Sequence, residues 1–226
     1  MENIHEKGKP FNNSQAIIGA RIDSQKELIN RYDECASKSK LQSKISMATG
    51  LVLLGISINL FRTSHWIWGA IVLMVTLIVL YFFLLSRGLA AGAAYESGLL
   101  VPAILVSKHP LEIVVLANVA ASESINEQYA CKKITLQNLP LHIIALGEKV
   151  PCVAMFGGIR SDIYSNFEPR PLAWATDDYD AIQDEISRIR EEDWLFLQAV
   201  KEKVPAMMKG NEIALFDSNH EFMRVV

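Results

Sequence analysis

The stretch that decides the fold lies between residues 45 and 86, where two uncharged segments flank a single arginine. Residues 45–61 read ISMATGLVLLGISINLF, and residues 63–86 read TSHWIWGAIVLMVTLIVLYFFLLS, with Arg62 between them. At about 1.5 Å per residue these segments would form helices of roughly 25 and 36 Å, against a bilayer hydrocarbon core of about 30 Å. We therefore predict a transmembrane hairpin of two helices.

Aromatic residues stand near both ends of the second segment. Trp66 and Trp68 lie at its start and Tyr81 lies near its end, a pattern typical of spanning helices whose amphipathic rings settle at the membrane interface. The alternative is a helical hairpin buried inside a soluble protein. Neither flanking segment is large enough to cover so apolar a helix on all sides, so the lipid bilayer is the predicted partner of this region.

The connector between the two segments, residues 62–65, is so short that the helices must run antiparallel and both chain termini must share one side. The residues flanking the hairpin on that side carry five basic side chains: Arg31, Lys38, Lys40, Lys44 and Arg87. The connector contains only Arg62. Because basic residues are enriched on the cytoplasmic side of membranes, we expect a two-pass protein of the bacterial inner (plasma) membrane with cytoplasmic N- and C-termini.

Small residues follow the second apolar segment. Gly88 and Gly92 form a G-x-x-x-G pattern, and Ala94 and Gly98 continue the spacing. Such rows allow close approach of helix backbones, so Gly88 and Gly92 are candidate contacts of a homo-oligomer. Packing within one chain is the alternative. The pattern also leaves open whether residues 88–98 prolong the second membrane helix or lie beyond its end.

Residues 1–44 are predicted to be an N-terminal tail followed by an amphipathic helix. From residue 14 onward, Ile18, Ile22, Ile29 and Tyr32 recur at spacings that place them on one narrow helix face. This face could pack against the C-terminal domain or against a second copy of the chain. Residues 45–98 would then comprise the hairpin with its small-residue extension, and residues 99–226 a separate domain.

Residues 99–226 predict an α+β domain, in which a small mixed or antiparallel β-sheet is followed by one or two helices. Short runs rich in Val, Ile and Leu, bounded by turn residues, indicate strands. The predicted strands are residues 100–107, 111–118, 129–138, 150–156 and 212–216.

Helical periodicity follows the strands. Thr176 or Asp177 offers an N-cap, and one apolar stripe ends at Ile189 while a second begins at Trp194. One long helix or two short helices joined near residues 190–192 both fit this pattern.

The Pro- and Gly-rich stretch from residue 157 to residue 174 is predicted to be a long exposed loop. Long loops without secondary structure are often functional, so its aromatic residues Phe167 and Trp174 are candidate contacts for an unknown protein partner. Burial of both side chains in the core of the domain is the alternative.

Charge and composition argue against several classes of function. Residues 99–226 hold 12 basic and 18 acidic side chains, and such an acidic domain does not suit nucleic acid. The three cysteines, Cys35, Cys131 and Cys152, are odd in number and widely spaced, as in a reducing compartment. Asp217 and His220 lack a third nearby ligand for a metal. We expect no catalytic activity, cofactor or metal; a thiol enzyme using Cys131 or Cys152 is the least favoured alternative.

Three stretches resemble a family of uncharacterised bacterial membrane-anchored proteins: residues 102–106 (PAILV), 150–158 (VPCVAMFGG) and 167–176 (FEPRPLAWAT). The resemblance covers roughly residues 100–204 and implies a bacterial, membrane-tethered domain without catalytic residues to assign. We predict a membrane-anchored cytoplasmic interaction or scaffold module. The alternative is an oligomeric membrane assembly that forms or gates a pathway.

Overall fold

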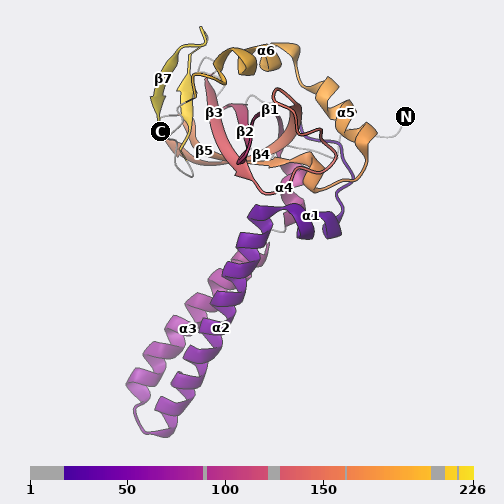
Figure 1. Cartoon of the computed structure of the whole chain (residues 1–226). Coiled ribbons are helices and arrows are strands. Elements are labelled where there is room, and N and C mark those ends of the chain that lie inside the picture. The colour runs from indigo at the N-terminus through magenta and orange to yellow at the C-terminus, as the bar shows by residue number, and fades with distance from the viewer. Residues whose placement is uncertain (1–17, 89–90, 122–127, 161, 205–211, 218) are drawn as a thin grey trace, which may run out of the picture. The chain divides into compact units, whose positions relative to one another are not determined.

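The computed structural model describes residues 18–88, 91–121, 128–160, 162–204, 212–217 and 219–226. The chain divides into two units (Figure 1). The sheet unit comprises the residues up to Asp33 and from Gly92 onward, and the helical hairpin comprises residues 34–91. The division thus falls at residues 33 and 91, whereas charge and hydropathy suggested residues 44 and 98. Residues 18–33 belong to the sheet unit because they pack on its strands and helices.

Two helices form the helical hairpin, α2 (Glu34–Arg62) and α3 (Trp66–Gly88), which pack against each other along their length. Their interface contains small residues: a Cβ atom on Gly50 would lie 3.1 Å from Cδ2 of Leu80, so a larger residue there would require the Leu80 side chain to shift. The hydroxyl group of Ser57 donates a hydrogen bond to the Gly69 carbonyl at 2.9 Å. The polar group of the buried Ser57 side chain is therefore satisfied within the hairpin.

The outer surface of the helical hairpin is apolar and exposed. Among the described residues, one helical stretch, Lys44–Arg62, is long and apolar enough to cross a membrane, and Trp66–Tyr81 is a shorter apolar stretch. The large apolar side chains that α2 and α3 expose include Leu51, Val52, Ile56, Ile58, Trp66, Ile67, Trp68, Ile71, Met74, Leu77, Ile78 and Tyr81. The described residues of this unit leave these side chains uncovered.

The sheet unit is built on a seven-stranded antiparallel sheet in the order β5-β4-β1-β2-β3-β6-β7. Its strands are β1 (Leu99–Lys108), β2 (Leu111–Asn118), β3 (Tyr129–Leu136), β4 (Lys149–Arg160), β5 (Ile163–Pro171), β6 (Ala214–Phe216) and β7 (Phe222–Val225). Its helices are α1 (Lys26–Tyr32), α4 (Ala91–Ser97), the 3-10 turn η1 (Leu172–Trp174), α5 (Tyr179–Arg188) and α6 (Glu191–Val200). The expected α+β class is confirmed, and the sheet is antiparallel.

The sheet curls, so that the residues just after β2 form hydrogen bonds with the edge strand β5. The carbonyl of Val119, just beyond β2, accepts a hydrogen bond from the Tyr164 amide at 2.8 Å, and Ala120 forms an isolated bridge with Ile163. Lys132 on β3 also reaches β5, because its ammonium group donates to the Phe167 carbonyl at 2.9 Å. The core therefore lies inside the curl, with α6 packed on β1 and β2 and α5 packed on β4.

The predicted loop at residues 157–174 is wrong. β4 extends to Arg160 and β5 occupies residues 163–171, so this stretch is a β-hairpin that ends in η1. Pro169 and Pro171 argued against a strand, because proline has no N–H group to donate to a neighbouring strand. β5 accommodates both prolines because it lies at the edge of the sheet.

The predicted amphipathic helix is wrong over residues 18–44, while residues 1–17, with the predicted tail and the start of that helix, lie outside the described residues. Residues 18–25 precede α1 without helical structure, α1 is only seven residues long, and the helix breaks at Asp33 before α2 begins. On the predicted apolar face, Ile29 is buried but Ile18 is 39% exposed. Hydrogen bonds with the rest of the sheet unit set the backbone conformation of this segment. In particular, the Ile18 carbonyl accepts from the Leu100 amide at 2.8 Å.

The two short helices of the sheet unit agree with one of the two predicted arrangements. α5 begins after Asp178, whose carboxylate accepts a hydrogen bond from the Ala181 amide at 3.0 Å, one residue beyond the predicted cap. The helix ends at Arg188, and α6 starts at Glu191, because Ile189 and Arg190 adopt extended backbone. This break places the Arg190 side chain at the cavity described next.

Candidate functional site

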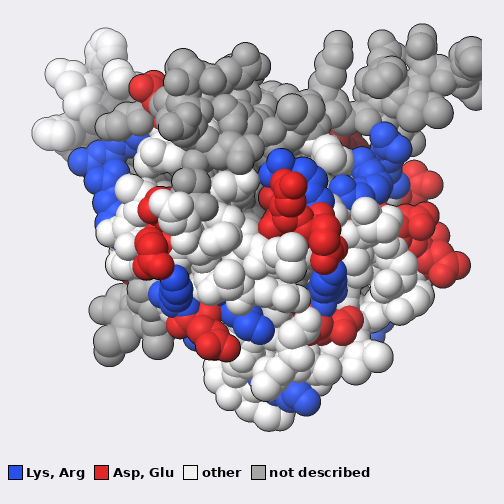
Figure 2. Space-filling view, turned by 90° about the horizontal axis from the view of Figure 1, so that it is seen from above, with Lys and Arg blue, Asp and Glu red and all other residues white. Residues whose placement is uncertain are grey.

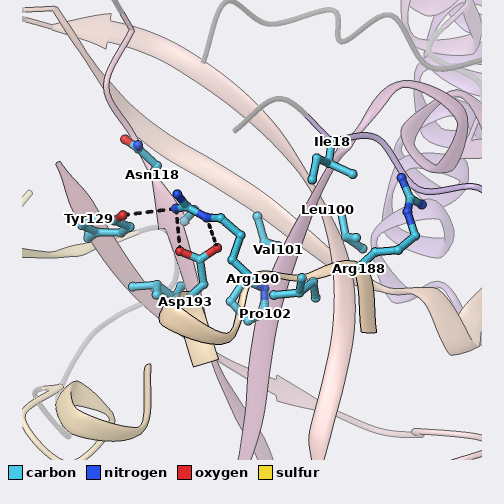
Figure 3. Close-up of a pocket in the computed structure, with 12 residues that line it drawn as sticks. Ile18, Leu100, Val101, Pro102, Asn118, Tyr129, Arg188, Arg190 and Asp193 are labelled. Atoms are coloured by element: carbon cyan, nitrogen blue, oxygen red, sulfur yellow. Dashed lines mark hydrogen bonds and ion pairs between the residues drawn. The ribbon is translucent and has the colours of Figure 1, made fainter. Parts of the chain in front are cut away.

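A cavity of about 190 Å³ lies in the sheet unit where β1 and β2 separate (Figure 3). The two strands pair from Ala103 and Val115 toward their shared turn, but not in the other direction. The unpaired ends therefore leave space between them, which Ile189 and the α5–α6 turn border. The cavity exists because the ladder stops, and no local sequence motif marks it.

Apolar side chains form most of the cavity wall. They come from β1 (Leu100, Val101, Pro102), β2 (Leu116, Ala117), the N-terminal segment (Ile18) and the α5–α6 turn (Ile189). A proline in β1 is compatible with this position, since the neighbouring β2 ladder ends close to it. The wall suits an apolar molecule or an apolar part of one.

Arg190 forms the polar side of the cavity with Asp193 and Tyr129. Its Nη2 donates to Asp193 Oδ1 at 2.8 Å and to the Tyr129 hydroxyl at 3.4 Å, while its Nε donates to Asp193 Oδ2 at 3.0 Å (Figure 3). The hydrogen bond with Asp193 raises the pKa of the Arg190 guanidinium above its ordinary value. The guanidinium therefore stays charged, and the carboxylate opposite it compensates that charge.

The second arginine at the cavity, Arg188, is held by Glu185. The Glu185 side chain is nearly fully buried, and both of its oxygens accept from Arg188 Nη1, at 2.6 and 2.7 Å. Glu185 also accepts from the Arg21 amide at 3.0 Å, and Arg188 donates to the Gly19 carbonyl at 3.0 Å. This ion pair therefore fastens the N-terminal segment beside the cavity.

Asn118 contributes an amide group at the end of β2. The residue is 6% exposed, and its Oδ1 accepts a hydrogen bond from the Ala120 amide at 3.1 Å. Within the part of the chain that the structure describes, its Nδ2 has no acceptor. The cavity thus combines apolar walls with one amide donor and an internally compensated pair of charges, an arrangement that favours binding over covalent chemistry.

A second polar cluster joins the two points at which the chain leaves and re-enters the sheet unit. Asp33 is fully buried, and its Oδ2 accepts from Arg170 Nη1 at 3.0 Å and from the Tyr95 hydroxyl at 3.1 Å. Arg170 also donates to Glu168 at 2.7 Å. Asp33 directly precedes α2 in the chain and Tyr95 lies in α4, so this cluster fixes both ends of the sheet unit that connect to the helical hairpin.

The aromatic residues predicted as partner contacts are placed in the core. Phe167 is fully buried and Trp174 is 2% exposed. Trp174 Nε1 donates to the Asn138 carbonyl at 2.9 Å, which satisfies its polar group inside the fold. This placement agrees with the core alternative, so neither side chain offers a surface to a partner.

The small residues predicted as oligomer contacts are separated by the structure. Gly88 is the last residue of α3, and Gly92 lies in α4, where no described atom outside its own chain neighbours and helix backbone lies within 4 Å of the Cβ position. Gly98, which continues the row, packs inside the sheet unit instead: a Cβ there would overlap the Ala94 carbonyl oxygen and lie 3.0 Å from Val153. A role of Gly88 and Gly92 in an oligomer stays a prediction.

The thiols of Cys131 and Cys152 occupy unreactive settings. Cys131 and Cys152 are fully buried, and burial raises the pKa of both thiols, which disfavours the nucleophilic thiolate. Among the described residues there is no group of three or more metal-ligating side chains, and Asp217 and His220 belong to the turn between β6 and β7.

The sequence reasoning missed the cavity residues Asn118, Tyr129, Arg190 and Asp193. They come from the end of one strand, the start of another and a break between helices. The only early signal was the ambiguity at residues 190–192, which marked a place where the backbone leaves helical geometry.

The comparisons with known proteins concern mainly the sheet unit. Residues 89–205, which are 117 of the 226 residues, match a protein family described as "Protein of unknown function (DUF3239)". A solved structure described as "Crystal structure of a putative membrane protein from Corynebacterium diphtheriae" is similar with 24% sequence identity and a TM-score of 0.42, over 46% of this chain and 89% of that chain. No curated protein is significantly similar to the chain in sequence.

Proposed function

This chain belongs to the family described as "Protein of unknown function (DUF3239)". That description names no activity, so we propose a function from the structures of the two units. The helical hairpin anchors the protein in the bacterial inner membrane as a two-pass segment, and the sheet unit acts in the cytoplasm as a binding module without catalysis. The observation that carries this proposal is the exposed apolar surface of α2 and α3.

The size of that surface argues for lipid as its partner. Sixteen large apolar side chains among the described residues of α2 and α3 are exposed, among them Ile67 at 76% and Val52 at 63%. At roughly 1.5–3 kcal/mol for each fully buried side chain, their transfer from water to hydrocarbon would contribute on the order of 20 kcal/mol or more. Exposed patches of this extent mark membrane or protein contacts.

The polar groups of the helical hairpin are compatible with hydrocarbon. Ser57 is bonded to the Gly69 carbonyl, and the Thr76 hydroxyl donates to the Val72 carbonyl at 2.8 Å. Inside a bilayer an unsatisfied polar group costs several kcal/mol, so hydroxyl groups are expected to find such partners within the helices. The basic residues flanking the hairpin support cytoplasmic termini.

The sheet unit supports a binding role more than an enzymatic one. Figure 2 shows basic and acidic side chains interspersed over one face. Ion pairs of the sheet unit include Lys203 with Glu221 at 3.1 Å and Lys133 with Glu112 at 2.7 Å. Such a mixed surface gives no single-sign field on that face to attract nucleic acid. The unknown partner is expected to be a protein.

A pair of matched substitutions tests the anchor. Val52→Arg on α2 places a charge on the surface proposed to contact lipid, at a cost of about 2.5–3.5 kcal/mol if the residue lies near the bilayer centre. Ile143→Arg changes a side chain of the sheet unit that is 75% exposed and serves as the control.

We expect the wild-type chain and the Ile143→Arg variant to resist alkaline carbonate extraction from membranes, whereas Val52→Arg together with Ile71→Arg releases the chain or lowers its membrane level several-fold. Topology is read from a C-terminal alkaline phosphatase fusion, which should be inactive. Extraction of the wild-type chain by carbonate would refute the anchor, and an active fusion would refute the cytoplasmic side.

A further inference from the structure

The cavity between β1 and β2 is large enough for a small organic molecule. Its volume is about 190 Å³, and an apolar protein cavity of about 150 Å³ is known to hold benzene. A six-membered ring with one short substituent would therefore fill it. The cavity borders the surface through the α5–α6 turn, where half of the Arg190 side chain is exposed.

The cavity wall contains one amide donor that is available to a bound molecule. Asn118 is 6% exposed, its Oδ1 accepts a hydrogen bond from the Ala120 amide, and no hydrogen bond joins its Nδ2 to a residue that the structure describes. Nδ2 is not one of the fully buried polar atoms that lack a partner, so water reaches it at the cavity. An oxygen atom of a bound molecule would replace that water as the acceptor.

The charges at the cavity define which oxygen fits. Arg190 is paired with Asp193 at 2.8 Å and Arg188 with Glu185 at 2.6 Å. Each guanidinium thus faces a carboxylate. An anionic ligand would therefore find no uncompensated positive charge to attract it, and the Asp193 carboxylate would repel it. A neutral carbonyl or hydroxyl oxygen meets no such repulsion.

We propose that the cavity between β1 and β2 binds a small uncharged molecule with an apolar ring or branched aliphatic body and one carbonyl or hydroxyl oxygen. The apolar part lies against Leu100, Val101 and Leu116, and the oxygen accepts a hydrogen bond from Asn118 Nδ2. This site belongs to the sheet unit alone and does not depend on the membrane anchor.

Methyl NMR of the full chain in lipid nanodiscs tests the proposal with three probes of similar size. Benzamide carries the neutral carbonyl, benzoate carries a carboxylate, and toluene carries no acceptor. The signals to follow are the methyl groups of Val101, Leu116 and Ile189 at the cavity, with Leu172 as a distant reference. We expect saturable shifts with benzamide at the cavity methyl groups and at least tenfold weaker binding of benzoate and toluene.

The matched variant is Asn118→Asp, which keeps the oxygen that accepts from Ala120 but removes the Nδ2 donor. It should weaken benzamide at least tenfold while changing toluene less than twofold. If the variant does not fold, the comparison of the three probes on the wild-type chain still decides. Equal affinity for benzamide and toluene, no saturable shift up to the solubility limit, or contacts between the cavity methyl groups and residues upstream of Ile18 would each overturn the proposal.

Discussion

Replacing Asp33 tests whether the buried cluster at the root of the sheet unit stabilises the fold. Asp33 is fully buried and accepts hydrogen bonds from both Arg170 and Tyr95. Asp33→Ala removes the carboxylate and leaves the Arg170 guanidinium, which is only 14% exposed, without this partner. The perturbation therefore removes one of the carboxylates that compensate this buried charge, while Glu168 remains.

The magnitude follows from this geometry. Removing one member of a buried ion pair costs about 3–5 kcal/mol, and we expect the lower end, about 3 kcal/mol, because Glu168 remains at 2.7 Å and Arg170 is not fully enclosed. Asp33→Asn keeps an oxygen acceptor and should cost less, about 2 kcal/mol. Tyr95→Phe removes one hydrogen bond to a carboxylate and should cost about 1.5 kcal/mol.

Urea unfolding of the detergent-solubilised chain, followed by tryptophan fluorescence, measures these free energies. Trp174 and Trp194 are buried in the sheet unit and report its unfolding. Trp66 and Trp68 are exposed in the helical hairpin and are replaced by phenylalanine to remove their background signal.

A double-mutant cycle with Asp33→Asn and Arg170→Gln isolates the pair, and we expect a coupling of about 1.5 kcal/mol or more. The control is Asp184→Asn, an exposed aspartate of α5, which should change the free energy by less than about 0.5 kcal/mol. A coupling below about 0.5 kcal/mol, or an Asp33→Ala variant as stable as the control, would show that this cluster does not hold the root of the unit.

Two further predictions concern titratable groups of the sheet unit. Burial lowers the pKa of His142 below its ordinary value, although Glu148 at 3.2 Å opposes the shift, so the folded state binds this proton less well than the unfolded state. The contribution of neutral His142 to the free energy of unfolding is therefore fully present above pH 6.5, and it is lost as the pH falls through the lowered pKa. The free energy of unfolding should thus fall between pH 7 and pH 5 by more in the wild-type chain than in His142→Gln, and parallel profiles would contradict this assignment. Cys131 and Cys152 should resist a maleimide probe in the native protein and react after unfolding. Mass spectrometry measures the labelling, with the partly exposed Cys35 as the reference. Labelling of Cys131 or Cys152 in the native state would contradict their burial.

Local patterns were sufficient to predict the elements whose physics is local. The strands β1 to β4 follow from apolar periodicity and turn residues, because a half-buried strand must carry its apolar side chains at the period of its backbone. Periodicity left open whether one helix or two follow them, and the structure has two. β5 escaped this reasoning: its prolines suit only an edge strand, and whether a strand lies at an edge depends on the order of all seven.

The sequence by itself determined the apolar helical pair and the α+β class, since both depend on the length and spacing of apolar runs. Only the tertiary structure decided where the functional candidates lie. Phe167 and Trp174 are core residues because the sheet curls around them, while Asn118, Arg190 and Asp193 meet at a cavity because the β1–β2 ladder ends early. These are contacts between residues far apart in the chain, which no local periodicity encodes.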